Sequence, residues 1–467
     1  MTPRVAVIGA GPAGLMAADA LSARGLHVSV HDRMPSVARK FLMAGRGGLN
    51  LTHTEPLDRF LSRYREGADM VAPAIDAFGP TDLRAFAHAL GEDTFAGTSG
   101  RVFPRSFKAS PLLRAWLARL RARDVTIATR ETLVGFEGAR PILAGADGAR
   151  RVVEADATVL ALGGASWPRL GSDGAWVPLL RDAGVAVAPL AASNCGVTVR
   201  WSDDTRARFA GAPLKRVAFA IDDRRSRGEA VVTAQGFEGG AIYALSSDIR
   251  EAVARDGAAV LHLDLIPDVS VEDAAAKLAA GRPKDSRANR LRKALALSPA
   301  ASAMLREGAG GPPPRDADAL ARHIKALPLH VVGVSGLDRA ISSAGGLRAV
   351  SLDKRFMVKA VPGLFAAGEM LDWDAPTGGY LLQAAFSTGL AAAEGVMAWL
   401  ADPSKPTRLC NSGDPLTRHA RRAAGPSGHP ESIKDGFPLA RDARVGNDMK
   451  ANQARSSITP RDTCGPD

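Results

Sequence analysis

The stretch RVAVIGAGPAGLMAADALSARGLHVSVHD, residues 4–32, constrains the fold more than any other part of the chain. It opens with the short apolar run RVAVI, which is typical of a buried parallel strand. Gly9, Gly11 and Gly14 follow in the spacing GxGxxG, which permits a tight turn, close approach of backbone to a pyrophosphate, and close packing of helix on strand. A helical pattern and a second strand ending at Asp32 complete the unit. The pattern predicts a Rossmann-like dinucleotide site.

The acid at the end of this unit has a specific predicted role. Asp32 lies 23 residues after Gly9, where a carboxylate accepts hydrogen bonds from the adenosine ribose hydroxyls. The helix N-terminus is expected to stabilise the pyrophosphate charge. An acid in place of an arginine argues against a 2′-phosphate. The other predicted contacts here are Ala10, Pro12 and Ala13 in the turn and Arg33 after the acid.

A second glycine crossing follows a later strand. The segment DATVLALGGASWP, residues 156–168, reads as a strand that runs into Gly163 and Gly164. These glycines are predicted to let the chain pass close to the edge that binds the dinucleotide. An ordinary strand–turn is the alternative interpretation of this segment on its own.

A third segment, residues 361–395, favours FAD over NAD. A short strand ends in Gly368 and Glu369, where a carboxylate can accept hydrogen bonds from ribitol hydroxyls that NAD lacks. TGGYLL then opens a long Ala-rich helix, so Gly379, Tyr380 and Leu381 are predicted contacts at a helix N-terminus that would stabilise a reduced flavin. No second GxGxxG follows a strand, so NAD(P)H is expected only as a transient co-substrate in the substrate cleft.

With these residues the chain resembles the BaiN/YhiN-type family of bacterial FAD flavoproteins, which includes aminoacetone-oxidase-like proteins. The resemblance covers about residues 1–400 and rests on VIGAGPAGLMAA, KFLMAGRGGLNLT, SGRVFPRSFKASPLL, LALGGASWP and GLFAAGEMLDWDAPTGGYLLQAAFSTG. It implies an α/β fold: a Rossmann-like FAD-binding domain of the two-dinucleotide-binding-domain flavoprotein type, interrupted by a β-rich insert.

The resemblance also implies contacts in the loop KFLMAGRGGLNLT. Lys40, Gly45, Asn50 and Thr52 are carried over as FAD contacts. The common family loop has Arg and Cys before the Asn, where this chain has Gly48 and Leu49, so the resemblance is to a subgroup without the loop cysteine. The complete set of predicted cofactor contacts is Gly9, Ala10, Gly11, Pro12, Ala13, Gly14, Asp32, Arg33, Lys40, Gly45, Asn50, Thr52, Gly163, Gly164, Gly368, Glu369, Gly379, Tyr380 and Leu381.

Patterning along the chain predicts four parts. Residues 1–190 form the first part of the FAD-binding domain, and residues 334–400 form its second part. Residues 191–333, where short alternating strands replace the earlier pattern, form a β-rich insert that serves the substrate. Residues 401–467, rich in Pro, Ser, Gly, Asp and Arg without an apolar period, are predicted to be a disordered tail.

Cationic residues suggest two binding surfaces, each with a simpler alternative. Arg101, Arg105 and Lys108 surround FP turns and would reach a substrate anion, unless they only form salt bridges. The run GRPKDSRANRLRK, residues 281–293, would give a helix a basic face for RNA, unless it is solvated surface. A small-molecule substrate is the leading expectation, RNA is the second, and no metal spacing is seen.

Cysteine usage and the N-terminal sequence predict a cytoplasmic protein. The three cysteines, Cys195, Cys410 and Cys464, show no disulfide framework, and the chain begins without a signal-like segment. The apolar stretch from Tyr380 to Leu400 contains Gln and Glu and is expected to be a core helix, so no membrane partner is predicted. The oligomeric state stays open.

Three functions remain in view. The leading hypothesis is an FAD-dependent oxidoreductase that transfers a hydride between the flavin and a small molecule, with NAD(P)H as reductant. The second is a flavin-dependent reductase of a uridine in ribosomal RNA, because family members have been associated with that reaction as well as with small molecules. The third is a non-catalytic flavin-binding regulator. No catalytic side chain is assigned.

Overall fold

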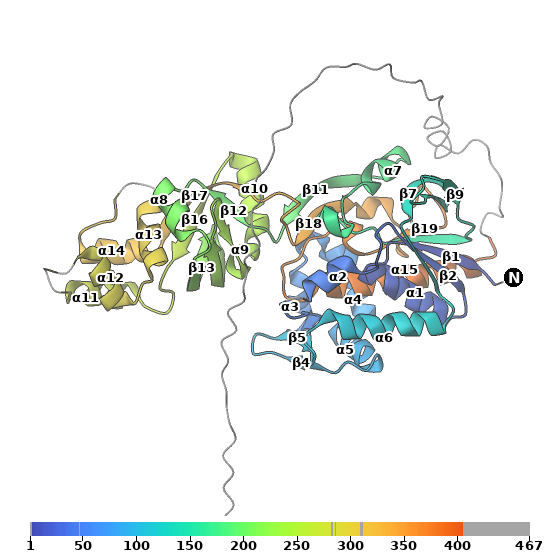
Figure 1. Cartoon of the computed structure of the whole chain (residues 1–467), viewed down its shortest axis with the longest axis horizontal. Helices are drawn as coiled ribbons and strands as arrows, with labels where there is room; N and C mark the ends of the chain where they lie inside the picture. Colours follow the sequence, from blue (N-terminus) through green and yellow to red (C-terminus); the bar gives the residue numbers. More distant parts are fainter. Residues whose placement is uncertain (1, 46, 282–283, 285, 309–311, 405–467) are drawn as a thin grey trace, which may run out of the picture. The chain divides into compact units, whose positions relative to one another are not determined.

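The computed structural model describes residues 2–45, 47–281, 284, 286–308 and 312–404 (Figure 1). All of them belong to the first of two units into which the chain divides, Met1–Ala423. The second unit, Ala424–Asp467, lies outside the described residues, and so does the predicted tail beyond residue 404.

A five-stranded parallel sheet with strand order β19-β10-β1-β2-β6 is the centre of the FAD-binding part. The run RVAVI forms β1 in its middle, with four of its five residues buried, because a central parallel strand is covered on both faces. The strands are β1 (Arg4–Ile8), β2 (His27–Asp32), β6 (Thr126–Thr129), β10 (Ala157–Leu160) and β19 (Leu364–Ala366).

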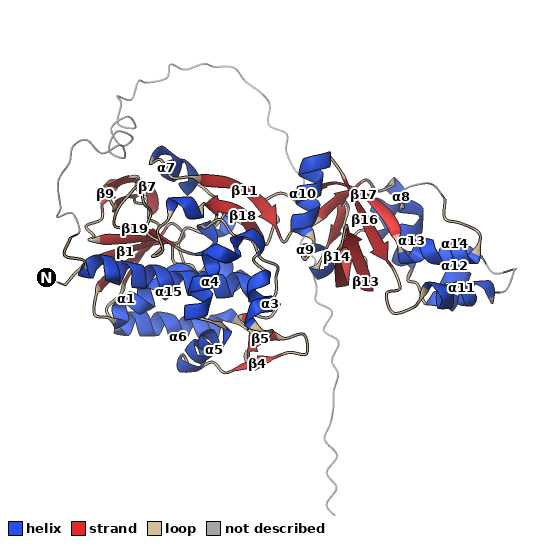
Figure 2. Cartoon of the chain, turned by 180° about the vertical axis from the view of Figure 1, so that it is seen from behind, coloured by secondary structure: helices blue, strands red, loops and turns tan. Residues whose placement is uncertain are grey.

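Helices cover one face of this sheet and a small antiparallel sheet covers the other (Figures 1 and 2). The central pair of helices, α1 and α15, pack against each other so closely that a side chain at Gly389 would lie 2.4 Å from the Ala13 carbonyl. The helices of this part are α1 (Pro12–Ala23), α2 (Arg39–Ala44), α3 (Leu57–Ser62), α4 (Ala68–Ala77), α5 (Pro80–Ala89), α6 (Ala109–Ala122), α7 (Trp176–Asp182) and α15 (Tyr380–Ala401). The small sheet consists of β7 (Thr132–Glu137), β8 (Arg140–Ala144) and β9 (Arg150–Val152).

Helix α15 is long and apolar enough to cross a membrane by length and composition alone. However, 56% of its most apolar window is buried within the protein. The buried Gln383 and Ser387 both donate hydrogen bonds to the Phe78 carbonyl, at 2.8 and 2.7 Å. These contacts are those of a core helix.

The insert is built on a closed antiparallel barrel with strand order β12-β15-β14-β13-β16-β17. Its hairpin β13–β14 turns at Asp222 and Asp223, where Asp222 has a positive φ of 49°, a conformation that Asp tolerates. The barrel strands are β12 (Val197–Val199), β13 (Pro213–Ile221), β14 (Arg224–Val232), β15 (Gly236–Glu238), β16 (Ala259–Asp264) and β17 (Leu327–Val334).

The insert also contains more helix than its β-rich pattern predicts. Four helices, α11 to α14, lie between β16 and β17 in the chain and complete the hydrophobic core around the barrel. The insert helices are α8 (Asp203–Phe209), α9 (Gly240–Tyr243), α10 (Ser246–Asp256), α11 (Val271–Ala279), α12 (Arg287–Leu295), α13 (Pro299–Glu307) and α14 (Ala317–Lys325). The predicted fold class, a Rossmann-like domain interrupted by a β-rich insert, is confirmed, and the insert's strands form a closed barrel.

Two short sheets complete the described chain. The antiparallel pair β11 (Val187–Ser193) and β18 (Ser342–Leu347) carries the chain into and out of the insert. The sheet β3-β5-β4 consists of β3 (Thr52–His53), β4 (Thr94–Ala96) and β5 (Arg101–Pro104). It joins the loop KFLMAGRGGLNLT to the segment SGRVFP through the pairing of Thr52 with Val102.

Candidate functional site

A cavity of about 600 Å³ opens at the carboxyl ends of the central parallel strands. The segments that follow β1, β10 and β19 supply Gly9, Gly163 and Gly368 to its wall. Because parallel strands end at the same edge of the sheet, three segments far apart in the sequence meet there. This is the edge at which open α/β sheets bind their ligands.

The β1–α1 turn forms part of the cavity wall. A side chain at Gly9 would lie 2.2 Å from the Ala161 carbonyl oxygen, so this position requires glycine, and its φ is +104°. Gly11 lines the cavity, and no protein atom lies within 4 Å of a side chain built on it. The open space at Gly11 lies at the N-terminus of α1, where backbone N–H groups and the helix dipole favour a phosphate.

Asp32 also lines the cavity and holds this turn in place. Its Oδ2 accepts a hydrogen bond from the Ala10 N–H at 2.9 Å, and its Oδ1 accepts one from the Met34 N–H at 2.8 Å. The neighbouring Arg33 lines the cavity too, and its guanidinium pairs with Asp173. The acid therefore orders the β1–α1 turn and faces the ligand space.

Lys40 and Glu369 form an ion pair in the cavity wall. The Lys40 ammonium lies 2.6 Å from Glu369 Oε2 and donates to Ser166 Oγ at 2.6 Å. Glu369 Oε1 also accepts from the Ser343 N–H at 3.0 Å. Both side chains line the cavity, so the carboxylate predicted to meet ribitol hydroxyls is held in place by a lysine from the loop KFLMAGRGGLNLT.

The loop that precedes α15 forms another part of the cavity wall. Thr377, Gly378, Gly379 and Leu381 line it, together with Asn50. The Asn50 Oδ1 and the Ser172 Oγ are buried cavity-lining atoms that have no hydrogen-bond partner among the described residues. Unpartnered buried polar atoms call for a ligand or water. The open Gly11 cradle, the helix N-terminus and these orphan oxygens fit the pyrophosphate and polar groups of FAD.

The predicted contacts divide into two groups by position. Thirteen of them line the cavity: Gly9, Gly11, Pro12, Ala13, Asp32, Arg33, Lys40, Asn50, Gly163, Gly368, Glu369, Gly379 and Leu381. The other six, Ala10, Gly14, Gly45, Thr52, Gly164 and Tyr380, do not.

Close packing explains the positions of this second group. A side chain at Gly14 would lie 1.9 Å from the Gly9 carbonyl oxygen, and one at Gly45 would lie 2.7 Å from the Ala109 Cβ. A side chain at Gly164 would meet Ser343 Oγ at 2.5 Å. Thr52 is fully buried, and its backbone lies against Gly379. These residues shape the walls behind the cavity.

Tyr380 points away from the cavity into a separate aromatic and ionic cluster. Its ring stacks on His53 with centroids 5.5 Å apart, and its hydroxyl donates to Glu55 Oε1 at 2.5 Å. Burial and this hydrogen bond raise the pKa of the Tyr380 hydroxyl well above its ordinary value. Burial alone would raise the Glu55 pKa, but hydrogen bonds from Arg63 and Tyr380 hold it below its ordinary value.

The Glu55 cluster yields a pH-dependent prediction. Replacing Glu55 with Gln is expected to lower the free energy of unfolding by about 1–2 kcal/mol at neutral pH, because charge-assisted hydrogen bonds from Arg63 and Tyr380 are lost. The folded-state pKa of Glu55 is lowered, so its contribution is present above the unfolded value of 4.5 and is lost as pH falls through the lower folded value.

Urea unfolding of wild type and Glu55→Gln, at neutral pH and at several values below 4.5, measures this difference. The gap between the two proteins should shrink toward low pH. The carboxylate of the exposed Glu229 has no ion-pair or hydrogen-bond partner among the described residues, so Glu229→Gln is the matched control. This variant should show no comparable difference from wild type. A Glu55→Gln gap that stays constant with pH would contradict the assignment.

The loop position at which the family resemblance implies a cysteine is an apolar core position here. Leu49 is fully buried, and its N–H donates to the Phe107 carbonyl at 2.9 Å. Cys195, the free cysteine of the described residues, is also buried, and burial raises its pKa to about 11. Neither position offers a thiolate at neutral pH.

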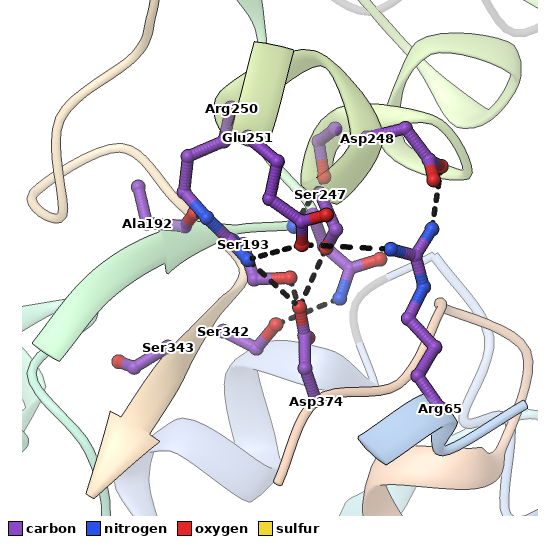
Figure 3. Close-up of polar contacts among 12 residues, drawn as sticks. Arg65, Ala192, Ser193, Ser247, Asp248, Arg250, Glu251, Ser342, Ser343 and Asp374 are labelled. Carbon is purple, nitrogen blue, oxygen red and sulfur yellow. Dashed lines mark hydrogen bonds and ion pairs between the residues drawn. The ribbon is translucent and has the colours of Figure 1, made fainter. Parts of the chain in front are cut away.

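A polar network joins the insert to the cavity wall (Figure 3). The Asp374 carboxylate accepts from Ser193 Oγ at 2.6 Å and from Ser247 Oγ at 2.5 Å. Arg250 of α10 lies 3.6 Å from the same carboxylate and donates to the Ala192 carbonyl at 2.9 Å. Helix α10 of the insert is thus bonded to β11 and to the segment that leads into the TGGY loop, which consists of residues 377–380.

Asn194 lies at the centre of this junction. Its side chain donates to Ser342 Oγ at 2.7 Å and to the Ala375 carbonyl at 2.8 Å, and its Oδ1 accepts from the Thr377 N–H at 2.9 Å. Its own N–H donates to Ser246 Oγ at 2.9 Å. Asn194 is 1% exposed, so these bonds are made away from water.

Several cavity residues were not among the predicted contacts. His31 and Glu131 line the cavity, with His31 Nδ1 2.6 Å from Glu131 Oε2, and burial lowers the His31 pKa despite that carboxylate. Arg101, Ser172 and Ser342 line it as well. Glu131, Ser172 and Ser342 lie outside the quoted motifs and reach the cavity through long-range packing. His31 directly precedes Asp32 in the first unit, and Arg101 lies in SGRVFP beside the FP turn.

Comparison with known proteins identifies the family. The HI0933-like protein Rossmann domain matches residues 3–395. The 3-dehydro-bile acid delta(4,6)-reductase of Clostridium scindens is 26% identical over 411 residues, covering 83% of this chain and 98% of the relative. The ribosomal RNA dihydrouridine synthase of Escherichia coli is 25% identical over 415 residues, covering 84% of this chain and 97% of the relative.

Two solved structures are similar at lower identity. The 3-ketosteroid delta1-dehydrogenase from Sterolibacterium denitrificans is 13% identical with a TM-score of 0.48, covering 85% of this chain and all of that chain. The open conformation of a flavocytochrome c3 fumarate reductase is 16% identical with a TM-score of 0.47, covering 86% of this chain and 79% of that chain. The family assignment rests on the match over residues 3–395, and it agrees with the parallel sheet and its cavity. The chain is an FAD-dependent oxidoreductase that belongs to the HI0933-like Rossmann family.

Proposed function

We propose that the protein transfers a hydride between FAD and a small-molecule substrate, with NAD(P)H as a transient reductant. The observation that supports this most is the cavity itself. It brings the Gly11 cradle, the TGGY loop and the exposed Arg101 into one cavity wall. The cavity therefore offers a dinucleotide site together with an exposed cation that is accessible to a separate molecule.

The chain's own residues would bind and orient, while bound FAD would supply the hydride chemistry. Lys40 fixes the Glu369 carboxylate in the cavity wall, and Asn50 Oδ1 offers a free acceptor. The N-terminus of α15, which begins at Tyr380, would favour negative charge at the flavin edge. Tyr380 would not donate a proton, because its hydroxyl is committed to Glu55.

Purified protein loaded with FAD and mixed with NADH or NADPH tests the proposal. Without oxygen, the flavin absorbance is expected to bleach, and a panel of ketones, enones and amines should restore it with at least one member. A flavoprotein that neither nucleotide reduces would overturn the role of NAD(P)H. Reduction with no acceptor in the panel would favour the alternative of a non-catalytic flavin-binding regulator.

Reduction of a ribosomal RNA uridine is the second candidate function. The similarity to the Escherichia coli ribosomal RNA dihydrouridine synthase favours it. The measurement is the dihydrouridine content of ribosomal RNA from cells with and without the gene. Unchanged content removes this candidate. A cytoplasmic location, without a membrane partner, remains part of the proposal.

A further inference from the structure

The hairpin β4–β5 presents aromatic rings and cations on one face. Phe95 on β4 lies directly opposite Phe103 on β5, and their ring centroids are 5.9 Å apart. Side chains alternate along a strand, so Arg101 shares the face of Phe103, while the buried Val102 and Pro104 point the other way. This face carries two rings and a cation next to one another.

Phe107 adds a third ring at a conformational cost. Its φ is +57°, a left-handed conformation that is rare for a bulky residue. Two backbone hydrogen bonds hold it there: its N–H donates to Pro104 O, and its C=O accepts from the Leu49 N–H, both at 2.9 Å. Its ring lies 5.1 Å from Phe95 and 5.5 Å from Phe103, yet it is 49% exposed. Strained residues of this kind cluster at ligand sites.

The cations beside these rings lack counter-ions. Arg101, Arg105 and Lys108 are exposed, and none of their side chains forms an ion pair or hydrogen bond with any residue that the structure describes. The nearby acids are already engaged. Asp93 pairs with His88 at 2.7 Å, and Glu92 Oε1 accepts from the Ser106 N–H at 3.0 Å.

Arg101 connects this surface to the cavity. It lines the cavity, and its Nε lies 3.8 Å from a side chain built on Gly378 of the TGGY loop. A Cβ built on Gly48, in the loop KFLMAGRGGLNLT, would lie 3.6 Å from the Phe103 ring and 3.4 Å from the Phe107 ring. The aromatic surface therefore meets the cavity wall at Arg101, beside the TGGY loop.

We propose that the aromatic hairpin surface, formed by Phe95, Phe103, Phe107, Arg101, Arg105 and Lys108, binds the substrate and selects an anion with a planar apolar body. The inference rests on the proposed function and names its substrate class. The rings would stack on the planar body, and the unpaired cations would meet its negative charge. Arg101 would orient the reducible part toward the cavity.

A small anion fits this surface better than a nucleic acid. Single-stranded RNA needs a track of phosphate contacts in addition to a stacking platform. Helix α12, which belongs to the most basic segment of the insert, does not extend the surface, because it lies at the end of the insert away from the β4–β5 hairpin (Figures 1 and 2). Helix α12 contacts α11 and α13, and Arg287 uses its guanidinium to bind the Pro313 and Pro314 carbonyls, each at 3.0 Å.

Equilibrium dialysis of the FAD-loaded protein against 8-anilinonaphthalene-1-sulfonate, a planar apolar anion, tests the proposal. Arg101→Gln and Phe107→Asn are each expected to weaken binding at least about fivefold, as loss of one charge or one stacking ring does. Asparagine tolerates positive φ, so the second variant removes the ring while keeping the backbone. The neutral N-phenyl-1-naphthylamine should bind more weakly and should not respond to Arg101→Gln.

Arg114→Gln is the matched control. Arg114 is exposed on α6, and it does not line the cavity. Its guanidinium has no ion-pair or hydrogen-bond partner among the described residues. Unchanged dye affinity in both Arg101→Gln and Phe107→Asn overturns the proposal, as does an equal loss in Arg114→Gln. Tighter binding of an oligouridine that displaces the dye would also overturn it, in favour of RNA. Because binding is measured without turnover, failure of NAD(P)H to reduce the flavin would count against the proposed function and leave this result standing.

Discussion

Replacing Gly11 with valine is expected to abolish FAD retention while leaving the fold intact. Apart from the adjoining residues, no protein atom lies within 4 Å of a Cβ built at Gly11, and the position lines the cavity. The backbone at Gly11 is extended, with φ −81° and ψ −177°, a conformation that valine adopts readily, so the fold is expected to stay intact. The valine would nevertheless occupy the space at the N-terminus of α1 that a pyrophosphate needs. Dissociation constants for FAD should rise at least about a hundredfold, which corresponds to about 2.7 kcal/mol of lost binding free energy.

The measurement is the ratio of flavin to protein after purification, followed by titration of the apoprotein with FAD. Far-ultraviolet circular dichroism and the melting temperature of the apoprotein report on the fold, and neither should change. Gly333→Val is the control, since this strand glycine also has no atom within 4 Å of a built side chain and does not line the cavity. Normal FAD content in Gly11→Val would mean that the cofactor does not approach the α1 N-terminus.

The Rossmann unit could be predicted from the sequence because its determinants are local. The run RVAVI, the three glycines and Asp32 lie within one strand–helix–strand unit, and each constrains its neighbours. The partnership of Lys40 with Glu369 is different. These residues are 329 positions apart, so their ion pair depends on how β19 and α2 meet at one sheet edge. The sequence predicts Lys40 and Glu369 as separate FAD contacts, but it does not predict the ion pair between them.

Tyr380 shows how a motif places a backbone without fixing its side chain. The TGGY sequence correctly predicts the start of α15, which begins at Tyr380. The direction of the Tyr380 ring is decided by partners from another segment. The ring stacks on His53, and the Glu55 carboxylate accepts a hydrogen bond from the Tyr380 hydroxyl. Whether Tyr380 contributes a backbone contact to the cofactor stays a prediction.

The insert was harder to anticipate in its helical part. Strand alternation in segments such as LKRVAFAIDD signals the barrel clearly. Helices α11 to α14 are short, rich in alanine and charge, and bury few large side chains each. Their stability comes from packing against one another and the barrel, which single-segment patterns do not show.

Replacing Asn194 with alanine is expected to have the second large effect, on stability and on FAD affinity together. The substitution leaves the Thr377 N–H and the Ala375 carbonyl without their partner in a buried junction. Buried polar groups stranded in this way cost about 1–3 kcal/mol each, so a loss of about 3–5 kcal/mol in unfolding free energy is expected. Asn194 also has a φ of +50°, which alanine adopts less readily.

The same change should loosen the cavity. Thr377 and Gly378 line it, and the Asn194 side chain bonds this loop to Ser342 of β18. The bond to Ser246 of helix α10 is made by the Asn194 backbone N–H and is kept in the variant. A loop that must be ordered anew on each binding event binds its ligand more weakly, so the dissociation constant for FAD should rise about tenfold or more. Asn194→Gly separates loss of the side-chain hydrogen bonds from backbone strain. Glycine removes the same side chain but adopts the positive φ without strain.

If the side chain matters as argued, Asn194→Gly should lose FAD affinity as Asn194→Ala does, while losing slightly less stability. Chemical denaturation and FAD titration of both variants measure this. The exposed Asn289→Ala on α12 serves as the control. A variant that is destabilised but binds FAD with unchanged affinity would show that Asn194 only holds the domains together. Parallel losses would instead show that the junction at Asn194 and the TGGY loop form one cooperative element, because the same side-chain bonds then stabilise the fold and order the cavity wall.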